Sequence, residues 1–221
     1  MPIAQVQKAI NNIGNSGSIT ITLAGAPTAG NLLVLIYTVK TPSTTISIGI
    51  GGWTQAIAEG TGGTRTRLHY KLASGDAAAT TIAFEEGDAR CVAAVAEYSG
   101  MAATDVLDQT GDASDTSSIT SLLVTARGAT TTAEELLICG VGHGGNVSVP
   151  TWTDSFTAQG NDETGSGLTH IDMQWAHRIV AATGTYETTA GWTTGRASAG
   201  VLATFKGPTT QAGRSTAFVH I

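Results

Sequence analysis

The stretch AGNLLVLIYT, residues 29–38, returns 104 residues later as AEELLICGVG, residues 133–142. In both stretches a pair of leucines follows a turn-prone segment and begins a short apolar run. Apolar runs of this length, bounded by turn residues, are typical of β-strands. We therefore expect strands over residues 31–40 and 135–143.

Three further matches follow in the same order along the chain. They align Trp53 with Trp152, Tyr70 with Trp175, and Tyr98 with Phe205, at offsets of 99, 105 and 107 residues. Matches that keep their order while only loop lengths change predict an internal duplication, with repeat 1 over about 19–100 and repeat 2 over about 121–207. We expect the matched aromatic residues to be structural core: Trp53, Tyr70, Tyr98, Trp152, Trp175 and Phe205.

The remaining sequence alternates polar and apolar residues, is rich in Thr, Val and Ile, and is interrupted by Gly, Asp and Ser. This pattern favours strands throughout, apart from a short helical turn considered around 102–107. The predicted fold is all-β: a jelly-roll-like antiparallel β-sandwich built from two internally repeated halves. A single fused body is preferred over two separate sandwiches.

We divide the chain into an N-terminal arm (1–17), a duplicated body (18–207) and a C-terminal tail (208–221). The polar connector 108–118 between the repeats is expected to be either a loop or a surface strand used in assembly.

Composition narrows the class of protein. The 221 residues are 41% hydrophobic and only 13% charged, with a net charge of −6 and no cluster of Lys or Arg. Nucleic-acid binding through phosphate neutralisation is therefore not expected, and no apolar run has membrane-spanning length. The first ten residues lack the features of a secretory signal, and we expect Cys91 and Cys139 to be buried thiols rather than a disulfide. The low charge suggests that much of the exterior faces other protein.

One strand carries a row of cations. Alternation places Arg65, Arg67, His69 and Lys71 on one face of the segment 64–73 and Leu68, Tyr70 and Leu72 on the other. The corresponding outward residues of the second repeat, among them His170, Asp172, Gln174 and Arg178, do not match this row. We interpret the row as a solvated face, with a ligand-binding face as the alternative.

The search for chemical motifs predicts no enzyme, no catalytic residue, no cofactor and no metal site. His170 and Asp172 make half a metal site without a third ligand, and GHGGN (142–146) is better explained by a glycine-rich hairpin than by an oxyanion hole. Adjacent carboxylates such as Glu85–Glu86 point to opposite faces of a strand and cannot flank a glycosidic bond. The candidate ligand or partner contacts are Trp192, Asp154, Asp162 and Glu163.

Four motifs carry a family resemblance: GNLLV (30–34), GWT (52–54), HYK (69–71) and AVAEYSG (94–100), with EELLI, TWT, MQWAH and LATFKG as degenerate counterparts in repeat 2. With them the chain resembles a family of tailed-phage virion structural β-sandwich proteins of the head-decoration, head-fibre or tail-associated type. The second repeat departs from the pattern at Glu135 and at Phe205–Lys206.

The resemblance implies a virion protein made in the host cytoplasm and located on the capsid surface or tail. Its expected role is capsid decoration (cement), stabilising the head through contacts with the major capsid protein or other virion proteins. A homo-oligomer such as a trimer is expected, without nucleic acid or membrane, and with segments 1–17 and 208–221 as attachments. The alternative is a carbohydrate- or receptor-binding module of a head or tail fibre that uses Trp192 and the acidic 154–163 region.

Overall fold

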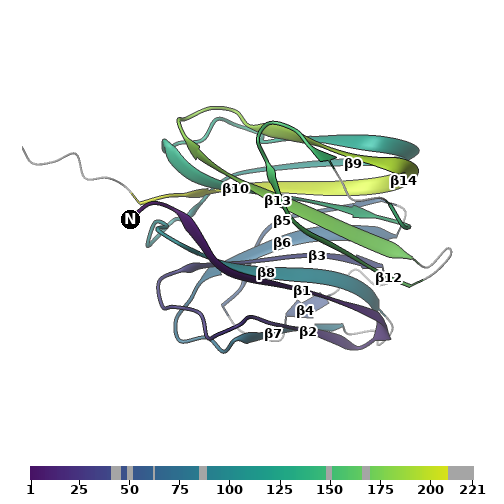
Figure 1. Cartoon of the computed structure of the whole chain (residues 1–221), viewed down its shortest axis with the longest axis horizontal. Coiled ribbons are helices and arrows are strands. Elements are labelled where there is room, and N and C mark those ends of the chain that lie inside the picture. The colour runs from purple at the N-terminus through teal and green to yellow at the C-terminus, as the bar shows by residue number, and fades with distance from the viewer. Residues whose placement is uncertain are drawn as a thin grey trace, which may run out of the picture.

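The computed structural model describes residues 1–40, 46–48, 52–61, 63–84, 89–147, 151–165 and 170–208. This described part contains strands and no helix, and every strand pairing in it is antiparallel. Figure 1 shows them as stacked layers. The strands are β1 (Ala4–Ser16), β2 (Ser18–Thr22), β3 (Leu32–Lys40), β4 (Ile46–Ile48), β5 (Thr54–Thr61), β6 (Thr64–Leu72), β7 (Ala79–Phe84), β8 (Ala89–Ser99), β9 (Leu107–Thr125), β10 (Glu134–His143), β11 (Thr151–Trp152), β12 (Thr157–Thr164), β13 (Ile171–Ala181) and β14 (Glu187–Lys206).

The first repeat forms two sheets. A five-stranded sheet has the order β1-β8-β3-β6-β5, which we call the first main sheet, and a three-stranded sheet has the order β2-β7-β4, which we call the first cover sheet. Strands β1 to β8 thus cross repeatedly between two layers as in an eight-stranded jelly roll, except that β5 lies beside β6 in the first main sheet.

The second repeat has the same order, although β9 and β14 are longer than their counterparts β1 and β8. The last part of β14 pairs with β10 and with the first part of β9, and together with β13 and β12 they form the second main sheet. The register between β9 and β14 shifts at Arg196, beyond which residues 121–125 and 187–191 pair with each other. These two segments and β11, which also pairs with β14, form the second cover layer. The duplication predicted from the sequence is therefore confirmed.

Strand register shows which aligned residues are equivalent. Leu32 pairs with Tyr98 as Leu136 pairs with Phe205, so these two matches have equivalent places in the sheets. Thr54, however, pairs with Tyr70 as Thr157 pairs with His177.

Two of the matches made from the sequence therefore join residues that are not equivalent in the structure. Trp53 precedes Thr54 as Phe156 precedes Thr157, so Phe156 is the counterpart of Trp53, while Trp152 lies in β11. By the same registers Trp175 corresponds to Leu68 and not to Tyr70. Both repeats contain a Trp-Thr dipeptide, at 53–54 and 152–153, but the first stands at the start of β5 and the second at the end of β11, so the matching letters are not structurally equivalent.

Three apolar clusters fill the spaces between layers. The central cluster lies between the two main sheets, and each of the others lies between a main sheet and its cover layer. Each repeat is therefore a sandwich of its own, and the two sandwiches share the central core. Both faces of the main sheets are covered, which explains why eight consecutive residues of β3 are buried.

Two expectations about segments are corrected, and the connector takes the strand form, one of its two predicted alternatives. Residues 1–17 are not an arm outside the repeat, because β1 pairs along its length with β8 at the edge of the first main sheet. The connector 108–118 lies within β9 and is paired with β14, and residues 102–107 form no helix. Residues 209–221 of the tail lie outside the described residues.

Candidate binding site at the seam between the two jelly rolls

The main sheets face each other with opposite strand order. At one edge β1 lies against β12, and at the other edge β5 lies against β9, while β6 faces β10 and β14 between them. Because β12 is the counterpart of β5, and β9 the counterpart of β1, the two seams are related by an approximate two-fold axis, as in a symmetric dimer interface.

Each seam is tied by a carboxylate. At the first seam Asn12 Nδ2 donates to Asp162 Oδ2 at 2.8 Å. At the second seam a hydrogen bond with the Ser114 side chain helps to lower the pKa of Glu59, the counterpart of Asp162. Asp162, expected from the sequence to be a ligand contact, thus joins the two jelly rolls.

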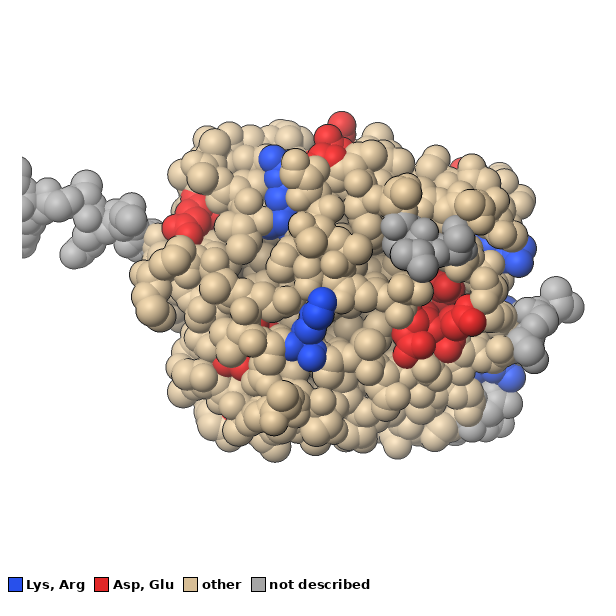
Figure 2. Space-filling model, in the orientation of Figure 1, with Lys and Arg blue, Asp and Glu red and all other residues tan. Residues whose placement is uncertain are grey.

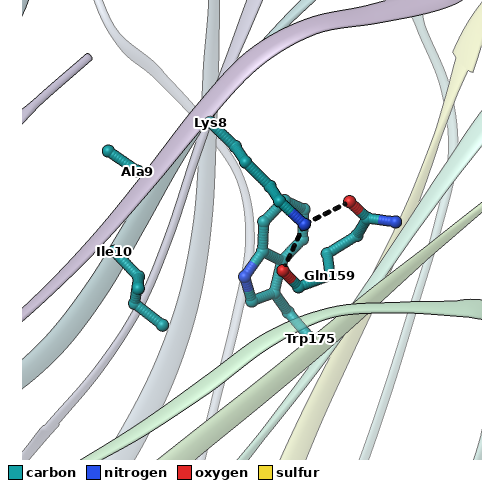
Figure 3. Close-up of a pocket in the computed structure, with 5 residues that line it drawn as sticks. All are labelled: Lys8, Ala9, Ile10, Gln159 and Trp175. Atoms are coloured by element: carbon teal, nitrogen blue, oxygen red, sulfur yellow. Dashed lines mark hydrogen bonds between the residues drawn. The ribbon is translucent and has the colours of Figure 1, made fainter. Parts of the chain in front are cut away.

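The first seam contains a cavity of about 140 Å³ lined by Lys8, Ala9, Ile10, Gln159 and Trp175. Figure 3 shows Lys8 extending from β1 across the indole of Trp175 toward Gln159. Lys8 Nζ donates to the backbone oxygen of Gln159 at 2.5 Å and to its Oε1 at 3.0 Å, and lies 6.0 Å from the centroid of the Trp175 ring. Trp175 is 1% exposed and its Nε1 has no hydrogen-bond partner.

A cross-strand exchange explains why the cavity lies at this seam. In the first repeat Ile57 is opposite Leu68, and both side chains are buried in the central core. In the second repeat the equivalent pair is Gly160 opposite Trp175. The larger ring replaces the leucine, and Gly160 has no side chain that would meet it: a Cβ atom there would lie 3.4 Å from Trp175 Nε1 and 3.7 Å from Ile10 Cδ1. Sequence alignment two residues out of register could not detect this exchange.

A polar bridge crosses the central core near the cavity. Tyr98 Oη and His177 Nδ1 are 2.8 Å apart, and Gln5 Nε2 donates to the same hydroxyl at 3.1 Å. Burial, together with the charge of Lys8, lowers the pKa of His177 to about 4. His177 is therefore neutral at physiological pH and serves as a hydrogen-bonding partner in the core.

The interpretation of the cation row as a solvated face is wrong for two of its members. His69 and Lys71 are buried, because their face of β6 is the one that the first cover sheet covers. His69 stacks on Tyr37 with ring centroids 5.6 Å apart, and burial, aided by the charge of Arg67, lowers its pKa to about 4. Lys71 pairs with Asp76 at 2.5 Å and lies 5.8 Å from the centroid of Trp53. Arg65 alone of the four is exposed.

The other candidate contacts of the second repeat do not share one environment. Trp192 is buried, donates Nε1 to Ile119 O at 2.9 Å, and packs edge-on against His143. Asp154 and Glu163 are exposed, and Glu163 accepts hydrogen bonds from Asn146 and from His170. A surface platform that includes Trp192 is therefore not present.

Asp172 was expected to face outward, and the structure corrects this. It is 2% exposed, lies opposite Glu163 in the β12–β13 ladder, and its Oδ1 has no hydrogen-bond partner. Burial and the negative charges of Glu163 and Asp162 raise its pKa to about 7. Within the described ranges, no group of three or more His, Cys, Asp or Glu side chains is placed to hold a metal ion.

Of the predicted core aromatics, Tyr98, Trp175 and Phe205 are fully buried between the main sheets. Tyr70 is partly buried against the same cluster, and Trp53 and Trp152 are partly buried under their respective cover layers. Cys91 and Cys139 are buried and unlinked, and burial raises the pKa of both thiols.

Comparison with known proteins finds no family model, no curated protein and no solved structure that matches this chain. Among the described residues, no helix is long and apolar enough to span a membrane.

Proposed function

We propose that this protein is a structural component of a virion, most concretely a decoration protein that stabilises the capsid through protein–protein contacts. The observation that carries the proposal is the surface. Figure 2 shows one face of the molecule on which Lys, Arg, Asp and Glu form a few small groups, among them one acidic cluster at the right, between broad uncharged areas. Cores of protein interfaces are depleted of charged residues, so such a face loses little solvation when another protein covers it.

The same surface includes exposed apolar side chains on a sheet edge. Val6 is 51% exposed and Ile10 is 36% exposed on β1, the edge strand of the first main sheet. A standard interface needs about 800 Å² from each partner, which is less than a tenth of the 9729 Å² surface of this chain. Jelly rolls recur in viral capsid proteins and in lectins, so the fold is compatible with the proposal. Because a fold does not determine function, the proposal depends on the surface.

Purified particles test the proposal. Virions released by cells that carry the gene would be washed and quantified for this protein by mass spectrometry against the major capsid protein. We expect copy numbers comparable to those of the capsid protein. Absence of the protein from particles that retain full infectivity would contradict the proposal.

Surface variants test where contact occurs. The double variant Val6→Lys/Ile10→Lys adds two charges to β1, and we expect it to bind particles lacking the protein at least tenfold more weakly. Leu123→Lys is the matched control, because Leu123 is 49% exposed on the other jelly roll. Equal loss of binding by the control would contradict the placement of the contact on β1.

The carbohydrate-binding alternative relied on Trp192 as a stacking surface. Because that indole is buried, no specific contact now favours the alternative over capsid decoration. Binding of the isolated protein to a glycan array would restore it.

A further inference from the structure

The cavity beside Trp175 has the size of a single side chain. Its volume of about 140 Å³ is close to that of an engineered apolar cavity of about 150 Å³ that holds one benzene molecule. Its walls are Ala9, Ile10 and the indole, so most of the lining is apolar. Figure 3 shows the opening between Ile10 and the indole, with the Lys8 side chain along one side.

The rim of the cavity is positively charged. The hydrogen bonds of Lys8 Nζ go to the two neutral oxygens of Gln159, and the ion pairs of the described residues do not include Lys8. A carboxylate that approaches this ammonium would gain an attractive interaction without displacing an existing ion pair.

We propose that this cavity binds a leucine-sized aliphatic side chain that stands next to an acidic residue on an extended segment of a partner protein. The aliphatic group lies against Ala9, Ile10 and the indole, and the carboxylate lies beside Lys8. Val6, exposed two residues before Lys8 on β1, offers apolar surface for the neighbouring part of that segment. The site does not depend on a virion role, and its test can fail independently of that role.

Nuclear magnetic resonance of the ¹⁵N-labelled full chain tests the site through the indole N–H signal of Trp175, assigned with the variant Trp175→Phe. The probe is the peptide acetyl-Gly-Asp-Leu-Gly-amide. We expect it to shift this signal saturably, with a dissociation constant on the order of 1 mM. The peptides acetyl-Gly-Asp-Gly-Gly-amide, which lacks the aliphatic group, and acetyl-Gly-Lys-Leu-Gly-amide, which reverses the charge, should bind about tenfold more weakly.

Variants of the chain separate the two parts of the site. Gly160→Ala places a methyl group 3.4 Å from Trp175 Nε1 and 3.7 Å from Ile10 Cδ1, and should abolish peptide binding while the thermal midpoint is retained. Lys8→Met should bind the Asp and Lys peptides equally. Ile10→Glu, at a partly exposed position where folding is expected to be retained, should repel the acidic peptide.

Three results would overturn the proposal. The first is no saturable shift of the Trp175 signal up to about 10 mM of the Asp-Leu peptide. The second is unchanged binding by both Gly160→Ala and Ile10→Glu. The third is binding of free 4-methylpentanoate without binding of the peptide, which would make this a small-molecule site.

Discussion

Two buried carboxylates show how single residues exchange roles between the repeats. In the first repeat the backbone N–H of Thr28 donates to Oε1 of Glu97 on β8, at 2.8 Å. In the second repeat the N–H of the equivalent Thr132 donates to Oε1 of Glu135 on β10, at 3.1 Å. The turn before the central strand is therefore held by a carboxylate in both repeats, although the carboxylate comes from different strands.

Asp172 makes the stability of the protein depend on pH. Its pKa in the folded chain, about 7, exceeds the ordinary value of 3.8. Between these pH values the folded state binds a proton that the unfolded state has released, so the contribution of Asp172 to stability falls as the pH rises.

The variant Asp172→Asn removes this dependence. We expect the free energy of unfolding of the variant minus that of the parent chain to be about 1–3 kcal/mol larger at pH 8 than at pH 4. Urea denaturation of both chains at both pH values measures this difference. A difference between the two chains that stays constant over this range would contradict the assignment.

Close approach of the two main sheets depends on Gly142. A Cβ atom at this position would lie 2.3 Å from Thr38 Oγ1 and 2.4 Å from Thr66 Oγ1. Both threonines are buried and β-branched, so neither can move aside easily. We expect Gly142→Ala to lower the free energy of unfolding by about 1–3 kcal/mol.

Gly144→Ala is the matched control for that measurement by denaturant titration. Its added methyl group would meet Thr64 Oγ1 at 3.5 Å, an ordinary contact, so we expect little change. Equal destabilisation by the two variants would mean that sheet spacing is not the cause.

At the scale of strands, the two repeats fill the same place in the core with different cross-strand pairs. The first repeat uses Ile57 opposite Leu68, and the second uses Gly160 opposite Trp175. Both pairs follow a register shift at the same place in their hairpins, between Gln55 and Ile57 and between Ala158 and Gly160. The pair therefore acts as one packing unit.

A double-mutant cycle tests that unit. Trp175→Leu should lower stability by about 3 kcal/mol through lost burial, and Gly160→Ile should lower it by about 1–3 kcal/mol through overpacking against the indole. The double variant restores the residue types of the first-repeat pair. We therefore expect its loss of unfolding free energy to be smaller than the sum of the two single losses by at least about 1 kcal/mol. Additive effects in chemical denaturation would contradict the coupling.

For the whole molecule, the shared central core makes the two jelly rolls one folding unit. Residues from β3, β8, β10 and β14 are fully buried in the same cluster, so unfolding one repeat would expose the inner face of the other. We expect one calorimetric transition whose calorimetric and van't Hoff enthalpies agree. Two transitions, or a separately folded fragment 1–102, would contradict this.

Much of the fold could be anticipated from local pattern. Alternation and turn residues predicted the strands, and four matches that keep their order along the chain, among them Leu32 with Leu136 and Tyr98 with Phe205, predicted the duplication. The burial of His69 and Lys71 could not be read from alternation, because a period of two separates the faces of a strand without showing which face is covered. The uninterrupted apolar run at 32–37 was the available signal that a main sheet is covered on both faces.

Side-chain chemistry along the chain was sufficient to specify an all-β protein with two related halves, because strand formation and repetition depend on neighbouring residues and their order. The packing of the halves, the cavity beside Trp175 and the perturbed Asp172 arise only in three dimensions. They depend on which residues of distant strands lie opposite one another, and a shift of two residues in that register changes every such contact.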